Sequence, residues 1–231
     1  MENNILEMFA SIQGEGKYIG EPSLFIRFAG CNIRCNWCDS KFSWIENDGK
    51  FTIEDAIKFI EQNPSYKHLV ITGGEPLLHQ QDIIQIFHKL NQLQKNIVIT
   101  IETNGTIEPN FELRLWMHGF FRGNLWSVSP KLQFITKYNK ENLRPFTMDF
   151  NNVQWKFVID TEFIESEIEI VNDFIDRYRL ESNIILQPNG LRTHYDDVCK
   201  ELTEYIITNN LTQFRVLPQF HRMIWGHKRG V

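Results

Sequence analysis

The sequence predicts an α/β protein whose strands form a mostly parallel sheet, and three observations support this prediction. Short segments rich in valine, isoleucine and leucine alternate along the chain with longer segments whose apolar residues recur at helical spacing. Strands that are separated by helices form parallel sheets with right-handed crossovers. Polar or glycine-containing stretches follow several of the strands, and the carboxyl ends of parallel strands are where barrel enzymes collect their chemistry.

The strands and helices are expected to alternate through most of the chain. The expected strands are 23–29, 68–72, 97–102, 125–129, 153–159 and 183–187, with a seventh candidate at 213–217. A helix over 53–62 follows Thr52, which together with Asp55 can satisfy free amide groups of the first turn. Further helices are expected at 80–94, 163–179 and 195–210. The apolar stripes of these helices are assigned to the core and not to a cofactor site.

Length and composition limit the possible functions. A chain of 231 residues can build one sizeable core, so a single domain over 1–231 is expected. The formal net charge of −5 argues against a broad nucleic-acid surface. No apolar run of about 18 residues is present, so neither a transmembrane helix nor a membrane partner is expected. The four cysteines are sparse and no signal peptide is seen, which favours free thiols in a reducing, cytoplasmic compartment.

Three closely spaced cysteines are the most informative feature of the chain. Cys31, Cys35 and Cys38 have the spacing C-x3-C-x2-C and directly follow an apolar strand. A cluster of four irons is usually held by four thiolates, so three thiolates predict a cluster with one iron open to a small molecule. A zinc site would need a fourth ligand at short spacing, whereas the next histidine is His68 and the next cysteine is Cys199. Cys199 lies in an expected helix and is assigned to packing.

A second motif follows the next expected strand. The strand that begins at His68 ends in Gly73-Gly74-Glu75-Pro76. Paired glycines have no Cβ atoms and so allow a ligand to lie against the backbone, and the carboxylate that follows can bind an ammonium group. The alternative is an ordinary turn between a strand and a helix. That alternative loses weight because the cysteine motif lies about one strand–helix unit earlier.

These motifs together resemble the radical S-adenosylmethionine superfamily, whose members share the cysteine spacing, an aromatic residue before the last cysteine (here Trp37) and a GGEP motif (here Gly73 to Pro76). The resemblance implies that the three cysteines hold a 4Fe–4S cluster and that the methionyl group of S-adenosylmethionine chelates the open iron. It also implies a partial, open (β/α)-type barrel of about six parallel strands with a C-terminal extension.

The two ends of the chain make the resemblance more specific. The chain is similar to the 7-carboxy-7-deazaguanine synthase (QueE) family of 7-deazapurine and queuosine biosynthesis in the opening Ser11-Ile12-Gln13-Gly14-Glu15-Gly16, in Cys38-Asp39-Ser40 and in the ending Trp225-Gly226 and Lys228-Arg229-Gly230-Val231. The resemblance implies a lyase that converts 6-carboxy-5,6,7,8-tetrahydropterin to 7-carboxy-7-deazaguanine with loss of ammonia. It further implies a substrate-binding N-terminal segment 1–22, a tail 212–231, flavodoxin or ferredoxin as electron donor, and a homodimer.

The resemblance assigns roles to individual residues. Substrate contacts fall on Ile12, Gln13, Gly14, Glu15, Arg27, Thr72 and, through its main chain, Val231. Contacts to S-adenosylmethionine fall on Trp37, Cys38, Asp39, Gly74, Glu75, Ser129, Pro130, Lys131 and Gln187. Ser40 matches a position that offers Mg²⁺ a hydroxyl oxygen, which is a ligand type that Mg²⁺ accepts.

Some of these roles also follow from the residues themselves. Arg27 has the planar fork that binds a carboxylate through two hydrogen bonds, and an arginine within an apolar strand is costly without a partner. Glu102 ends an expected strand and could hold a ribose hydroxyl or the pterin. The alternatives are that Glu15 only caps its turn, that Thr72 only packs in its strand and that Lys131 is a solvated loop charge.

Two other functions remain open at this point. A glycyl-radical-enzyme activase shares the short barrel, the cysteine triplet and the GGEP motif, but it acts on a protein backbone and would not need Arg27 or the Gln13-Gly14-Glu15 segment. A non-catalytic iron–sulfur or zinc binding module would leave the segment Gly73 to Pro76 without a role. Turnover of the small pterin distinguishes these three possibilities.

Overall fold

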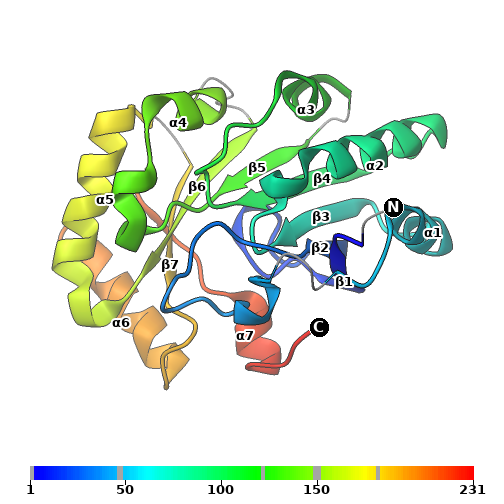
Figure 1. The fold of residues 1–231 in the computed structure, drawn as a ribbon. Coiled ribbons are helices and arrows are strands. Elements are labelled where there is room, and N and C mark those ends of the chain that lie inside the picture. The colour runs from blue at the N-terminus through cyan, green and yellow to red at the C-terminus, as the bar shows by residue number, and fades with distance from the viewer. Residues whose placement is uncertain (1–2, 46–48, 121–122, 148–151, 181–182) are drawn as a thin grey trace.

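The computed structural model describes residues 3–45, 49–120, 123–147, 152–180 and 183–231. Within this part of the chain eight strands form one sheet in sequential order, and its ribbon is shown in Figure 1. The first strand is antiparallel to the second, and every later neighbour is parallel. The strands are β1 (Ile5–Ile12), β2 (Pro22–Phe28), β3 (His68–Gly73), β4 (Val98–Thr103), β5 (Leu125–Val128), β6 (Val153–Ile159), β7 (Ile184–Pro188) and β8 (Arg215–Val216).

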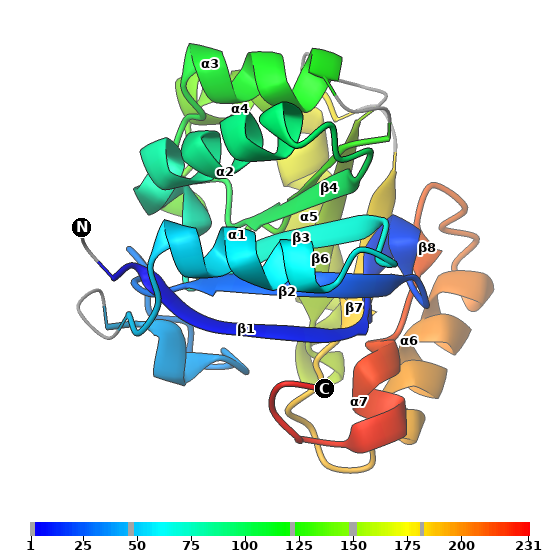
Figure 2. The same cartoon turned by 90° about the vertical axis from the view of Figure 1, so that its right-hand side faces the viewer.

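The helices cover one face of this sheet, and the C-terminal helix lies beside the other. The α-helices are α1 (Ile53–Gln62), α2 (Gln80–Gln92), α3 (Phe111–Leu115), α4 (Lys140–Thr147), α5 (Ile164–Tyr178), α6 (Tyr195–Thr208) and α7 (Phe220–Trp225). In Figure 2, α1 to α4 lie on one side of β1 to β3 and α7 lies on the opposite side with the C-terminus. Among the described helices, none has the length and apolar character needed to cross a membrane.

Alternation along the strands separates the core from the barrel interior. In β6, Trp155 and Phe157 are buried in the main hydrophobic core, whereas Lys156 and Val158 line a cavity on the other face. Successive side chains of a strand point to opposite faces, so a parallel strand between two apolar layers is normally apolar throughout. Other strands place polar residues at the same interior positions: Arg27 in β2, Thr72 in β3, Glu102 in β4, Ser127 in β5 and Gln187 in β7. The interior therefore carries a polar lining where a purely structural barrel would be apolar.

The sequence predictions for the fold are confirmed in most elements. The structure is an α/β open barrel, and the expected strands and long helices lie within two residues of those observed. The capping of α1 is also confirmed, because Asp55 donates its backbone N–H to Thr52 while its side chain accepts from the backbone N–H of Thr52. β1 was not expected as a strand. Within the sheet it pairs with β2 and runs antiparallel to it, and its Ile5 also forms an isolated bridge with Phe51, so the strand–helix–strand pattern does not include it. The first two residues of segment 1–22 lie outside the described part.

A buried histidine links three strands at the amino-terminal end of the barrel. His68 is 1 % exposed, and its Nδ1 lies 2.7 Å from the hydroxyl of Ser23 in β2 while its Nε2 lies 2.8 Å from the hydroxyl of Thr100 in β4. Burial lowers the pKa of His68 from about 6.5 to about 4. The ring is therefore neutral in the folded protein at pH 5, whereas the same ring in the unfolded chain is protonated.

This difference predicts an acid-sensitive stability. His68 binds a proton at pH 5 in the unfolded state but not in the folded state. Its contribution should therefore lower the free energy of unfolding by about 2 kcal/mol between pH 7 and pH 5. Urea unfolding of the wild type and of His68→Gln at both pH values measures the effect. The variant should show a smaller pH dependence, and His88→Gln, which changes an exposed histidine, should keep that of the wild type. Equal pH dependence in all three proteins would contradict the assignment.

Candidate functional site

A cavity of about 440 Å³ opens at the carboxyl ends of the strands. Its wall combines the interior positions of β2 to β7 with three other parts of the chain: the segment after β1, the cysteine loop after β2, and the C-terminal tail after α7. Within the described residues, six lysines and arginines and three carboxylate side chains line it. The excess of positive charge favours an anionic ligand.

The three predicted cluster cysteines lie together at one end of this cavity. Cys31 and Cys35 are buried, Cys38 is half-buried, and all three line the cavity. Burial raises the pKa of all three thiols, that of Cys35 to about 11, and the ammonium of Lys131 partly opposes the shift at Cys35. The free thiols are therefore neutral at pH 7, and binding of a metal would release their protons.

The arrangement of these thiols fits an iron–sulfur cluster better than a single ion. Within the described residues, no three histidine, cysteine, aspartate or glutamate side chains are grouped so that they could hold one metal ion. A cluster does not require this, because its thiolates bind different irons. Ile33 and Trp37 pack against the thiols and shield them from water. The residues present therefore fit a cluster with an open position facing the cavity.

The paired glycines at the end of β3 bring the cysteine loop close to the sheet. A Cβ atom on Gly74 would lie 2.2 Å from the backbone oxygen of Gly30 and 2.7 Å from Cβ of Cys31. A Cβ atom on Gly73 would lie 2.5 Å from the backbone oxygen of Phe28. Any other residue would push the cysteine loop away at Gly74 and the end of β2 away at Gly73. The glycines thus serve packing within the protein, and Gly74 also lines the cavity.

Glu75 is placed differently from what the sequence predicted. Its side chain is fully buried and is absent from the cavity wall. One carboxylate oxygen accepts from the backbone N–H of Leu77 at 3.0 Å and from the hydroxyl of Thr103 at 2.7 Å, and the other accepts from the backbone N–H of Asn104 at 2.7 Å. Its own N–H donates to Gly30 at 2.8 Å. In this structure Glu75 joins the ends of β3 and β4 to the cysteine loop.

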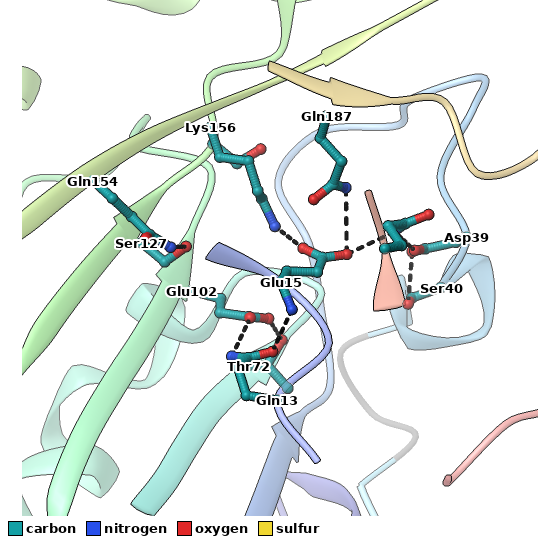
Figure 3. Close-up of polar contacts among 12 residues, drawn as sticks. Gln13, Glu15, Asp39, Ser40, Thr72, Glu102, Ser127, Gln154, Lys156 and Gln187 are labelled. Carbon is teal, nitrogen blue, oxygen red and sulfur yellow. Dashed lines mark hydrogen bonds and ion pairs between the residues drawn. The ribbon is translucent and has the colours of Figure 1, made fainter. Parts of the chain in front are cut away.

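The segment after β1 forms a hydrogen-bonded frame with the strand ends, drawn in Figure 3. Gln13 is buried; its amide nitrogen donates to Glu102 at 3.1 Å and its amide oxygen accepts from the backbone N–H of Glu15. The hydroxyl of Thr72 donates to the other oxygen of Glu102 at 2.9 Å. The predicted substrate residues Gln13, Glu15 and Thr72 are thereby brought together, and Glu102 connects them.

Glu15 forms the most heavily bonded carboxylate of the cavity. One of its oxygens is in contact with the ammonium of Lys156, and the other accepts from Gln219 at 2.6 Å and from Gln187 at 3.3 Å. Burial lowers the pKa of Lys156 to about 8, while the adjacent carboxylate favours the charged form of the lysine. Figure 3 shows Lys156 and Gln187 approaching Glu15 from the same side. The pair lies almost out of solvent, with side-chain exposures of 8 % and 12 %.

Arg27 lies in the cavity wall with an unexpected partner. Its Nε donates to Glu7 in β1 at 2.7 Å, and the other oxygen of Glu7 accepts from Arg229 of the tail at 2.7 Å. The guanidinium of Arg229 also stacks 3.5 Å from the ring centre of Phe42. Within the described residues, the two terminal nitrogens of Arg27 have no such bond. They can still grip a carboxylate through two hydrogen bonds.

The C-terminal tail is fixed against the segment after β1. The N–H of Phe220 donates to the backbone oxygen of Gly14 at 2.8 Å, and a Cβ atom on Gly14 would lie 2.0 Å from Nδ1 of His221. Glycine at this position therefore makes room for α7. The end of the tail, with Val231, lines the cavity.

The predicted cofactor residues are brought together on the remaining wall. The hydroxyl of Ser40 donates to Asp39 at 2.9 Å, so two hard oxygens face the cavity side by side. The ammonium of Lys131 donates to Ser129 at 2.7 Å and lies 5.3 Å from the ring centre of Trp37. Lys131 is thus a bonded part of the wall and not a solvated loop charge. The oxygens of Ser40 and Asp39 are of the type that Mg²⁺ prefers as ligands.

The structure thus assembles most of the predicted site and adds to it. Of the predicted residues, Glu75 and Pro130 do not line the cavity. Sequence reasoning missed Lys156, Gln219 and His221 as part of the wall, and it missed Glu7, which bonds to Arg27 and Arg229 of the wall. Lys156 could have been predicted as a site residue, because burying a lysine between Trp155 and Phe157 in an apolar strand is costly without a partner. Nothing in their local sequence marked Glu7 or Gln219.

Comparisons with known proteins agree with this site. The model of the radical SAM superfamily matches residues 25–143. A 7-carboxy-7-deazaguanine synthase of Pyrobaculum aerophilum is 31 % identical over 230 residues, which cover 98 % of this chain and 96 % of the relative. One of Thermoplasma acidophilum is 33 % identical and covers 98 % and 99 % of the two chains. The crystal structure of QueE from Escherichia coli is similar with a TM-score of 0.68 and 27 % identity, over 95 % of this chain and 94 % of that one.

The buried hydrogen bonds of Glu75 predict a large effect of removing its charge. In Glu75→Gln one of three donors would face an amide nitrogen, and hydrogen bonds to a charged group would be lost, so the free energy of unfolding should fall by about 2 kcal/mol. Urea unfolding of the metal-free protein measures this loss directly. Glu61→Gln, at an exposed position of α1, should change stability by less than about 0.5 kcal/mol. An unchanged unfolding free energy in Glu75→Gln would refute the structural role.

Proposed function

The chain belongs to the radical SAM superfamily and, within it, to the 7-carboxy-7-deazaguanine synthases, and from this premise we propose that it is a lyase that converts 6-carboxy-5,6,7,8-tetrahydropterin to 7-carboxy-7-deazaguanine with loss of ammonia. One observation carries the proposal: the three thiols, the terminal nitrogens of Arg27 and the polar frame around Glu15 and Glu102 all face one cavity. An activase acting on a protein backbone would need neither the arginine nor the frame. A purely structural metal module would need no cavity beside its thiols.

We propose that the cofactors bind in this cavity. We assign the 4Fe–4S cluster to Cys31, Cys35 and Cys38, which fit it as described above. The contacts proposed for S-adenosylmethionine are Trp37, Cys38, Asp39, Gly74, Ser129, Lys131 and the backbone that follows Gln187. When both are bound, the cluster and S-adenosylmethionine supply the one-electron chemistry that creates a carbon-centred radical beside the substrate. The hydroxyl of Ser40 is the proposed protein ligand of Mg²⁺.

The protein's own residues bind and orient the substrate. We assign the substrate carboxylate to the terminal nitrogens of Arg27, whose orientation is fixed by the bond from its Nε to Glu7. The frame of Gln13, Thr72 and Glu102 lines the same cavity as the thiols and offers both donors and acceptors to a heterocycle. Such bonds hold the reacting carbon in one position, which is the main contribution a protein makes to radical chemistry on a cofactor.

The tail completes the cavity. Arg229 bonds to Glu7 and stacks on Phe42, so the last residues lie over the side that the sheet leaves open. A closed cavity excludes water and other compounds that would quench a reactive intermediate. The terminal carboxylate of Val231 is proposed to contact the substrate through the main chain.

The partners carried over from the resemblance remain proposals. They are flavodoxin or ferredoxin as electron donor and a second copy of this chain. Support for an interface comes from α7, which exposes Phe220, Met223 and Ile224 at the spacing of one helix face. The three proposed cluster thiolates suit a reducing compartment such as the cytoplasm.

Anaerobic turnover tests the proposed function. The reconstituted protein, given S-adenosylmethionine, Mg²⁺, a reductant and 6-carboxy-5,6,7,8-tetrahydropterin, should form 7-carboxy-7-deazaguanine, detected by mass. Cys35→Ala should form none, whereas Cys199→Ala, which removes a thiol that does not line the cavity, should retain activity. Cleavage of S-adenosylmethionine without this product would sink the substrate assignment and favour the activase. No cleavage at all would favour the binding module.

Arg27 provides a test of the substrate carboxylate. Arg27→Lys keeps the charge but loses the planar fork, so kcat/KM for the pterin should fall by about 10- to 100-fold, mostly through KM. Steady-state kinetics at varied pterin concentration separates the two parameters. Lys228→Arg, a change of cation in the tail, is the matched control and should alter kcat/KM by less than about threefold. An unchanged KM in Arg27→Lys would place the carboxylate elsewhere.

A further inference from the structure

Lys156 is a buried cation whose bonding capacity the protein leaves largely unused. It occupies an interior position of β6, is 6 % exposed and lines the cavity. An ammonium group has three N–H donors. Within the part of the chain that the structure describes, the carboxylate of Glu15 accepts from one of them. The other donors face the cavity or its wall without a protein acceptor, which a folded protein normally avoids in a buried place.

Gln187 provides an independent observation at the same place. Its side-chain nitrogen donates to Glu15 at 3.3 Å, while its side-chain oxygen is buried and has no hydrogen-bond partner among the described residues. Gln187 is 3 % exposed. Reversing the amide would not help, because the oxygen would then face the carboxylate of Glu15 and the nitrogen would be left without an acceptor. An unpartnered acceptor therefore accompanies the unused donors of Lys156.

The three side chains form a compact set of complementary groups. Lys156 and Gln187 both contact Glu15, one at each carboxylate oxygen, and all three line the cavity. Figure 3 shows Lys156 and Gln187 on the same side of Glu15. The set offers a cationic donor beside acceptor oxygens from a carboxylate and an amide. A flat ligand that presents an oxygen next to N–H groups would satisfy them together.

The pyrimidinone ring of a pterin has this pattern along one edge: the 4-oxo oxygen accepts, and the neighbouring ring N–H and the 2-amino group donate. We infer that Lys156 donates to the 4-oxo oxygen while Glu15 and Gln187 accept from the N–H groups, which makes Lys156 the residue that selects a 4-oxo pterin over a 4-amino pterin. This inference rests on the proposed function. It assigns the Gln187 side chain to the substrate and leaves the backbone after it for S-adenosylmethionine.

Discrimination follows from the same chemistry. A 4-amino group in place of the oxygen turns a donor toward the ammonium, so the lysine stays buried without its acceptor. The neighbouring ring nitrogen also loses its hydrogen, so the acceptors of Glu15 and Gln187 lose one donor. Sites that are built to bond one polar group reject an analogue that lacks it far more strongly than apolar pockets reject a change of size. Replacing Lys156 with an apolar side chain of similar length removes the lysine's share of the penalty against the 4-amino compound and weakens binding of the 4-oxo compound.

Binding of two fluorescent pterins tests the inference without requiring turnover. The probes are 6-carboxypterin, which has the 4-oxo group, and its 4-amino analogue, 2,4-diaminopteridine-6-carboxylate. The full-length reconstituted protein with S-adenosylmethionine should bind the first at least about 30-fold more tightly. Lys156→Met should reduce this preference by at least about fivefold, with the remainder due to the acceptors of Glu15 and Gln187, and Lys156→Arg should keep most of it. Lys200→Met, an exposed lysine of α6, should keep the wild-type preference.

A structural role of Lys156 would give a different result. If Lys156 only holds Glu15 in place, Lys156→Met would weaken both probes equally and leave the preference unchanged, which would overturn the inference. Because Lys156→Met leaves a buried carboxylate unpaired, the double variant Glu15→Gln with Lys156→Met serves as a second test and should show a lower preference than Glu15→Gln alone. Failure of the wild type to bind either probe or to turn over the tetrahydropterin would instead refute the proposed function.

Discussion

The carboxylate of Glu15 joins parts of the chain that lie far apart in the sequence. Its oxygens contact Lys156 in β6 and accept from Gln187 in β7 and Gln219 before α7. It thereby connects the segment after β1 with the last long strands and the tail. The side of the barrel that the sheet leaves open is closed by these bonds and not by a further strand. The shape of the cavity therefore depends on this one charged group.

The buried ion pair of Glu15 and Lys156 is better suited to fixing the geometry of the cavity than to stabilising the fold. Burying an ammonium and a carboxylate costs a desolvation free energy that their attraction repays only when further hydrogen bonds satisfy both groups. Gln187 and Gln219 supply those bonds to the carboxylate, whereas among the described residues the ammonium bonds to Glu15 alone. An apolar pair of the same volume would stabilise the fold at least as well. We therefore attribute the presence of the Glu15–Lys156 pair to a ligand that binds in the cavity.

Glu75 is a second buried carboxylate that joins separate parts of the chain. Like Glu15, it accepts hydrogen bonds from several donors, which among the described residues are Leu77, Thr103 and Asn104. It fixes the turn after β3, and through Gly30 it fixes the start of the cysteine loop. Hydrogen bonds within the protein therefore hold the start of the cysteine loop in place even without a cluster. Rigid support of this kind is what a metal site needs from the residues around its ligands.

Much of the fold and of the site was predictable from the sequence, because the decisive patterns are local. Apolar runs of strand length, helical periodicity and the spacing of Cys31, Cys35 and Cys38 all lie within short windows. The partners that a side chain bonds to, by contrast, often lie far away in the sequence. The sequence shows that Glu75 follows two glycines, but its direction is set by Thr103 and Asn104, almost thirty positions later. Glu7 and Gln219 likewise act through partners more than 200 positions away.

Lys156 shows where sequence reasoning could have gone further. The argument that an arginine within an apolar strand needs a partner applies equally to a lysine between Trp155 and Phe157, since both cations would be costly to bury alone. For Arg27 the structure supplies Glu7 and leaves the terminal nitrogens open; for Lys156 it supplies Glu15 and leaves donors open. In a parallel barrel whose strands are otherwise apolar, a charged residue at an interior position is retained because a ligand completes its bonds. The interior positions of β2 and β6 are therefore the positions that we propose for binding the carboxylate and the oxo group of the substrate, on the same physical ground.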